Sequence, residues 1–244
     1  MPPSETQDSS DFARRFRASM PPSYRRAYGW EAIQEHAAIV DRRRGATVHL
    51  EVWRVRRGTV IVVASDDRSG GVAMMSAAIT SAGFDIVVAE TYRRICDGAP
   101  AEAVAIFELR RPNDERRPIA GSDLSPISRT LESLFLDEAG AENLLRRNAR
   151  TIPPGRQASP EVTFADDETA ILLVEARDRP GLLAAITSAL VEASACIAGS
   201  EIVTVEGRAR DRFELTESDG TSLSAARRAA VARSVSAAIE RSGP

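Results

Sequence analysis

The chain has 244 residues, 43% of them hydrophobic and 27% charged, which is enough for two ordinary globular domains. The formal net charge of −3 gives no electrostatic reason to expect nucleic acid as a partner, and two cysteines are too few for a disulfide framework. No apolar run is long enough to span a membrane and no hydrophobic signal core begins the chain, so we expect a cytoplasmic protein with no membrane contact.

The N-terminal region precedes any repeated pattern. Residues 1–22 are polar and contain prolines, so we expect them to form a disordered tail. Residues 23–45 are expected to hold an N-terminal helix, from about Trp30 to Arg43, whose apolar stripe consists of Ile33, Ala37 and Val40.

Two domains are expected beyond this region, over residues 46–140 and 161–244, with a proline-, glycine- and serine-rich linker over 141–160. Hydrophobic periodicity predicts for the first domain strands over 48–55 and 60–65, a helix ending near Ala82, strands over 84–95 and 103–110, and a helix from Pro126. It predicts for the second domain strands over 162–164 and 169–176, a helix over 180–193, strands over 195–205 and 212–216, and a helix capped by Ser222 or Ser224.

An internal duplication relates these domains. The corner between the second strand and the helix reads Asp67-Arg68-Ser69-Gly70-Gly71-Val72, and it recurs 111 residues later as Asp178-Arg179-Pro180-Gly181-Leu182-Leu183. The first copy carries about five extra residues after Glu90, so Phe107 then falls on Phe213 at a spacing of 106 residues. Since solenoid repeats are typically ~20–50 residues long, a repeat of this length indicates a duplicated domain.

Each copy reads ββαββα. The strand before the corner strand must then complete a four-stranded sheet, and helices on one face of an antiparallel sheet give a two-layer α+β sandwich. The two sheets can pair edge to edge, which also covers exposed strand edges.

The corner has a chemistry of its own. Pro180 suits a first helical turn, and Gly181 lets another backbone or a ligand come close. A helix start offers free N–H groups and a partial positive charge, both of which attract a carboxylate. The alternative is that the aspartate caps the helix and the glycine only permits the turn, with no ligand bound.

The segments 173–184 and 207–213 resemble ACT domains, which are ferredoxin-like regulatory modules that commonly bind amino acids. The closer resemblance is to the paired ACT domains that end bacterial PII uridylyltransferases, and it covers about residues 48–240. Catalysis in that family belongs to a nucleotidyltransferase domain and a His-Asp domain. This chain has no room for either, and its two histidines, His36 and His49, form no His-Asp pair. The resemblance therefore implies a free-standing sensing region without catalytic residues.

The resemblance also implies a site. ACT domains hold the α-carboxylate and amino group of their ligand at the corner, often between two domains. In the second copy the peptide N–H groups of Gly181 and Leu182 are expected to take the carboxylate and Asp178 the ammonium group. The other implied residues are Arg179 and Pro180 in the same corner, Cys196 and Ala198 as the side-chain pocket, and Asp67, Gly70, Gly71 and Asp85 as the first-copy equivalents. The first copy departs from the family pattern in Ser69 and Gly71, which replace a proline and a leucine.

Three functional hypotheses follow. The first is an amino-acid-responsive regulator, by analogy in nitrogen metabolism, that works as a homodimer or as an intramolecular ACT pair. The second is a ligand-free module that oligomerises or docks on a partner enzyme. The third, an enzyme, lacks support because the sequence shows no nucleophile with a base, no metal cluster and no phosphate loop, and it implies no cofactor. A thermal-shift panel of amino acids discriminates between the first two.

Overall fold

Eight strands form one antiparallel sheet, in the spatial order β1-β2-β4-β3-β7-β8-β6-β5, within the part of the chain that the computed structural model describes. That part comprises residues 5–55, 58–96, 98, 100–112, 114, 117–137, 143, 159–165, 169–179 and 181–241. The expected linker therefore lies almost wholly outside the described residues, and so does Pro180.

The elements of the two halves follow one another in the same order. The first half contains β1 (Val48–Val55), β2 (Thr59–Asp66), α4 (Gly71–Ser81), β3 (Asp85–Arg94), β4 (Glu102–Arg110), a 3-10 turn (Gly121–Leu124) and α5 (Ser125–Leu136). The second half contains β5 (Glu161–Phe164), β6 (Ala170–Arg177), α7 (Leu182–Glu192), β7 (Cys196–Val205), β8 (Arg208–Thr216) and α8 (Ala225–Arg241). This confirms the predicted ββαββα order and is compatible with two ferredoxin-like domains.

The register between the halves reveals an approximate two-fold axis. Glu90 of β3 lies directly opposite Glu201 of β7 in the antiparallel ladder. On the helical layer, the hydroxyl groups of Ser76 and Thr187 lie 3.2 Å apart. Each pair is separated by 111 residues in the sequence, so each copy meets its own equivalent position in the other copy. The halves thus pack within one chain as the subunits of an isologous dimer do, and the expected edge-to-edge pairing of the sheets is confirmed.

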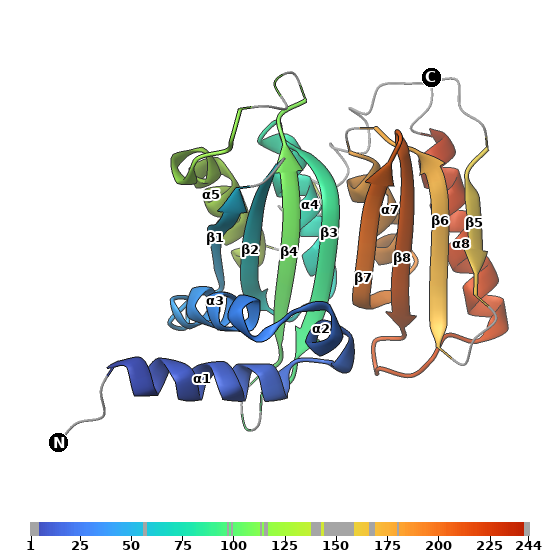
Figure 1. Ribbon diagram of the computed structural model, residues 1–244. Helices are drawn as coiled ribbons and strands as arrows, with labels where there is room; N and C mark the ends of the chain where they lie inside the picture. The colour runs from blue at the N-terminus through green and yellow to red at the C-terminus, as the bar shows by residue number, and fades with distance from the viewer. Residues whose placement is uncertain are drawn as a thin grey trace.

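The two faces of the sheet are covered differently (Figure 1). Helices α4, α5, α7 and α8 lie along one face, and α1 (Glu5–Ser19), α2 (Pro22–Ala27) and α3 (Trp30–Asp41) cross the other face over the first half only. Strand β2 is consequently buried on both faces, which explains its unbroken apolar run. Strand β8, whose outer face has no such cover, instead alternates between buried and exposed residues.

The structure differs from the expectation of a disordered tail over residues 1–22, since α1 occupies Glu5–Ser19 and α2 begins at Pro22; residues 1–4 lie outside the described part. Within residues 23–45 the helix expected from about Trp30 to Arg43 is confirmed as α3, and the short helix α2, separated from it at Tyr28 and Gly29, was not expected. The cause is a second hydrophobic core between these helices and the sheet, in which Phe16 is fully buried. The Arg94 side chain at the end of β3 also donates a hydrogen bond of 2.8 Å to the Ser19 hydroxyl. Tertiary packing therefore stabilises a segment whose polar composition alone predicts disorder.

Candidate functional site

The two strand-to-helix corners share one backbone geometry. Helices α4 and α7 each begin after a glycine in the left-handed region, with φ of 76° at Gly70 and 81° at Gly181. The residue at the N-cap position of both helices is a glycine, not the aspartate, and neither start has a side-chain cap hydrogen bond. Asp178 instead accepts a hydrogen bond from the Arg179 backbone within its corner.

The first N–H of each helix is already used, because Gly71 and Leu182 donate hydrogen bonds of 3.1 Å to the carbonyl oxygens of Arg68 and Arg179, so the expected role of the Leu182 N–H is wrong. In α4 the next two N–H groups, those of Val72 and Ala73, have no such bond among the described contacts and are left for other partners.

The first corner opens into a cavity of about 390 Å³, which we call the first-corner cavity. It is within the size range of sites for small organic ligands, which is roughly 300–1,000 Å³. Both halves of the chain contribute to its wall. The lining includes Asp67, Arg68, Ser69, Gly70, Gly71, Val72 and Ala73 from the first half, and Cys196, Ala198 and residues 216–220 from the second.

The contacts around this cavity leave the helix start accessible. Arg93 donates a hydrogen bond of 2.6 Å to the Asp67 carboxylate and holds it at the wall. Arg68 is directed elsewhere, since its guanidinium bonds the backbone carbonyl of Phe135. A Cβ atom added to Gly71 would meet nothing within 4 Å, so the missing side chain at this position leaves open space. The corner therefore presents a carboxylate and an uncapped helix N-terminus to a cavity.

The second corner is closed. Its cavity, the second-corner cavity, measures only about 20 Å³, close to the space that one water molecule needs (on the order of 10–15 Å³). Leu182 stands where the first corner has Gly71, and its side chain is buried. The guanidinium of Arg110 lies 2.7 Å from Asp85 and 3.4 Å from Asp178, which joins the two halves across the corner. An amino acid does not fit here without rearrangement.

The strand residues expected at each corner lie at the other corner in the structure. The sequence predicts Cys196 and Ala198 at the second corner and Asp85 at the first. Instead, Cys196 and Ala198 line the first-corner cavity, and Asp85 lies beside Asp178 at the second corner. The two-fold axis is the reason, because antiparallel pairing of β3 with β7 places the start of each strand beside the corner of the other half.

Asp211 is a residue that sequence reasoning missed. It lies on β8 in phase with the buried Ala209 and Phe213, is only 3% exposed, and lines the second-corner cavity. Neither of its carboxylate oxygens has a hydrogen-bond partner in the described structure. Burial, and then the charge of Asp178, raise the pKa of Asp211 to about 7. The available signal was a charged residue on the inward face of an alternating strand, at the position where the first copy has Ala105.

Asp178 is also perturbed. Burial is the main cause that raises its pKa, and the charge of Asp85 adds to it. The Arg110 guanidinium and hydrogen bonds from the Thr204 hydroxyl and the Arg179 backbone act in the opposite direction. The second corner therefore holds buried carboxylates that raise one another's pKa, whereas Asp67 at the first corner is paired with Arg93 and only partly exposed.

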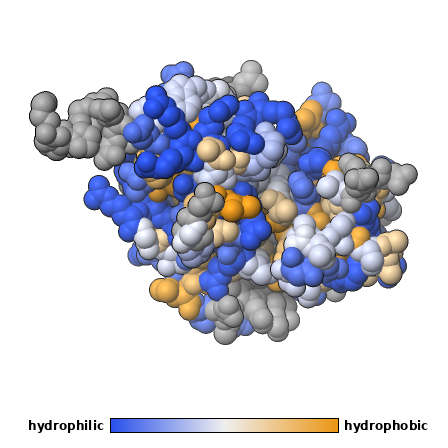
Figure 2. Space-filling view, turned by 90° about the horizontal axis from the view of Figure 1, so that it is seen from below, coloured by the Kyte–Doolittle hydropathy of each residue, from blue (hydrophilic) through white to orange (hydrophobic). Residues whose placement is uncertain are grey.

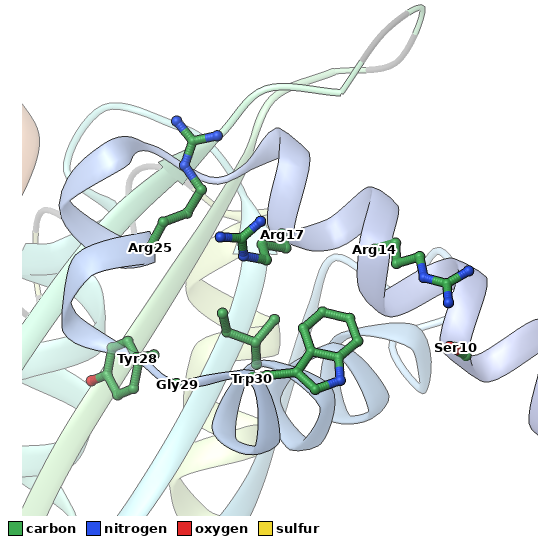
Figure 3. Close-up of a pocket in the computed structure, with 8 residues that line it drawn as sticks. Ser10, Arg14, Arg17, Arg25, Tyr28, Gly29 and Trp30 are labelled. Carbon is green, nitrogen blue, oxygen red and sulfur yellow. The ribbon is translucent and has the colours of Figure 1, made fainter.

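A further cavity of about 560 Å³ lies between α1 and the α2–α3 connection. Its arginines do not converge on one point: Arg25 points away from Trp30, and Arg14 lies beside Ser10 (Figure 3).

The molecular surface, seen from below relative to Figure 1, shows mainly hydrophilic side chains, with hydrophobic ones in small separate groups (Figure 2). Across the described ranges, no helix is both long and apolar enough to cross a membrane, and no group of three or more His, Cys, Asp and Glu side chains is arranged to hold a metal.

Comparison with known proteins identifies relatives. A bifunctional uridylyltransferase/uridylyl-removing enzyme of Bradyrhizobium diazoefficiens is 31% identical over 74% of this chain. The chain resembles these uridylyltransferases. The enzymes of Phenylobacterium zucineum and Rhodospirillum rubrum are 25% and 24% identical over 86% and 91% of the chain. No family model matches the sequence.

The match covers a small part of each relative. The chain spans 19% of the Bradyrhizobium enzyme, 22% of the Phenylobacterium enzyme and 24% of the Rhodospirillum enzyme. The similarity is consistent with the C-terminal region that the corner motif and the duplicated domains predicted.

Proposed function

We propose that this chain is a non-catalytic regulatory protein that binds a free amino acid in the first-corner cavity, with its two halves acting as an intramolecular pair of ACT domains. The observation that carries the proposal is the cavity itself, which joins the uncapped start of α4 to the strand start of the other half. The match to about a fifth of a much longer enzyme favours a regulatory over a catalytic region.

Each part of a zwitterion has a complementary group in this cavity. The N–H groups of Val72 and Ala73 in the first turn of α4 suit the α-carboxylate, because they lie at the positive end of a helix and, unlike that of Gly71, are not used within the turn. Asp67 suits the ammonium group, since a carboxylate that accepts one bond from Arg93 keeps further lone pairs. Cys196 and Ala198 offer a small, weakly polar surface to the ligand side chain.

The resemblance to the PII uridylyltransferase region favours a role in nitrogen metabolism. The ligand would act on a partner enzyme through the junction between the halves, because the cavity is built from both.

The test is a thermal-shift panel of the twenty amino acids with the full chain. A ligand at 100 times its dissociation constant adds about 2.7 kcal/mol to the stability of the folded state. Gly71→Leu, which places in the first corner the residue that closes the second, is expected to abolish the response. Gly121→Leu is the matched control, because Gly121 is exposed and a Cβ atom there also meets nothing within 4 Å.

A panel in which no amino acid raises the melting temperature at millimolar concentration refutes amino-acid sensing. The ligand-free oligomerisation or docking module then becomes the better hypothesis. A response that survives Gly71→Leu unchanged refutes the assignment to the first-corner cavity but not amino-acid binding as such.

A further inference from the structure

The second corner contains more negative than positive charge. Three carboxylates meet there: Asp85 from β3, Asp178 after β6, and Asp211 from β8. Two guanidinium groups oppose them, those of Arg110 and Arg179. One positive charge is therefore missing from a buried site, where an uncompensated charge is costly.

The imbalance is concentrated on Asp211. Arg110 is committed to Asp85 and Asp178, and Arg179 donates a hydrogen bond of 3.0 Å to the backbone carbonyl of Ile239 on α8. Asp211 has neither an ion pair nor a hydrogen bond in the described structure, although it is almost fully buried. Buried carboxylates with both oxygens unpaired are rare in native proteins and call for a partner.

The cavity beside Asp211 has room for one water molecule or one small ion. The second-corner cavity of about 20 Å³ holds roughly one water-sized body. Asp178 and the hydroxyl-bearing Thr204 share its wall with Asp211. Carboxylate and hydroxyl oxygens are hard ligands, which bind alkali cations and accept hydrogen bonds from ammonium alike.

We propose that the second-corner cavity binds one small monovalent cation, with the carboxylates of Asp211 and Asp178 as its main ligands. A monovalent cation neutralises the net negative charge of the corner, whereas a divalent ion would make the corner positive. Both ligands belong to the second half, and Asp178 is also joined to the first half through Arg110, which it shares with Asp85. The site is separate from the first-corner cavity and does not depend on amino-acid binding.

A proton on Asp211 is the competing occupant. Burial and the charge of Asp178 raise the pKa of Asp211 to about 7, so a proton can also neutralise this carboxylate near neutral pH. A cation and this proton compensate the same charge, so cation binding strengthens as the pH rises from 6 to 8. The other groups that face the carboxylate are Asp178 and Thr204, with Asp85, Thr80 and Arg179 along the same cavity wall.

The experiment measures thermal unfolding of the full chain, without amino acids, in chlorides of Na⁺, K⁺, NH₄⁺ and N-methylglucamine at equal ionic strength. We expect a saturable rise in melting temperature with at least one small cation relative to N-methylglucamine, larger at pH 8 than at pH 6. The three small cations separate an alkali-ion site from an ammonium site. Equal melting temperatures in all four salts at pH 8 overturn the proposal.

Variants locate the effect. Asp211→Ala, which introduces the residue of the first copy, and the isosteric Asp211→Asn are both expected to lose the cation-specific rise. Asp114→Asn, a change at an exposed aspartate, is the matched control and should keep it. A rise of equal size in either Asp211 variant that folds refutes the assignment, and ²³Na line broadening that is lost in Asp211→Asn provides a direct second measurement.

Discussion

Replacing Asp211 with asparagine is expected to stabilise the protein at neutral pH and to leave its stability nearly unchanged at pH 4. The native carboxyl has its pKa raised to about 7, so the folded protein keeps a proton that the unfolded chain releases. Stability then falls as the pH rises wherever the native state binds more protons than the unfolded state. Asparagine keeps the shape of the neutral acid and has no such proton to lose.

The magnitude follows from the two pKa values. With an unfolded value near 3.9, the shift is about 3 units, and each unit corresponds to about 1.36 kcal/mol, so the full penalty is about 4 kcal/mol. It is absent below about pH 4, grows by about 1.4 kcal/mol per pH unit, and is complete just above pH 7. For a chain of this length, that difference corresponds to roughly 10 °C in melting temperature.

The assay is urea unfolding of the wild type and Asp211→Asn between pH 4 and 8, in N-methylglucamine chloride so that no small cation neutralises the carboxylate. The difference between the two free energies of unfolding reports on Asp211 and on its coupling to the neighbouring Asp178, because the more distant titrations are common to both proteins. Curves that run parallel from pH 5 to 8 show that Asp211 is solvated or paired in the folded state, and would falsify the reasoning.

Three further outcomes are expected. Burial lowers the pKa of His36 to about 4, so acidification from pH 6.5 to 4 should cost up to about 3 kcal/mol of stability. The loss should be detected in the fluorescence of Trp53, whose ring centroid lies 4.1 Å from that of the imidazole, and it should be absent in a His36→Gln variant. Gly58→Ala should cost about 1–3 kcal/mol in urea unfolding, because its Cβ atom would lie 2.7 Å from a carbonyl oxygen of β4, whereas Gly121→Ala should be neutral. Phe213→Ala should cost about 3–5 kcal/mol by the same measurement, since the ring is fully buried; a cost below 1 kcal/mol contradicts the described core.

Local patterns predicted the elements well because the physics that decides them is local. The alternation in Val48–Val55 and the apolar run of Ala170–Arg177 fix strands, and the glycine before each helix fixes both corners. The duplication then predicted a paired sheet, since equivalent strand edges are left without partners in both copies. The contacts between segments that are distant in the sequence were harder to predict.

Three features lay beyond local patterns. The crosswise grouping of Cys196 with Asp67 depends on the antiparallel pairing of β3 and β7, which no single segment encodes. Helix α1 is stabilised by the packing of Phe16 in the second hydrophobic core, and the sequence alone does not indicate that this face of the sheet is covered by the N-terminal helices. The sequence shows that the corners differ, with Gly71 in the first and Leu182 in the second. Which of the two cavities is larger became clear only from the space around each residue.

The approximate two-fold axis has an evolutionary consequence. In a dimer of identical subunits, every substitution appears twice, so both copies of a symmetric site must change together. Here one gene encodes both halves, and a mutation at one corner leaves its counterpart untouched. The two corners of this chain can therefore differ, and they do: the first opens into a cavity of about 390 Å³, whereas at the second Arg110 joins the halves by pairing with Asp85 and Asp178.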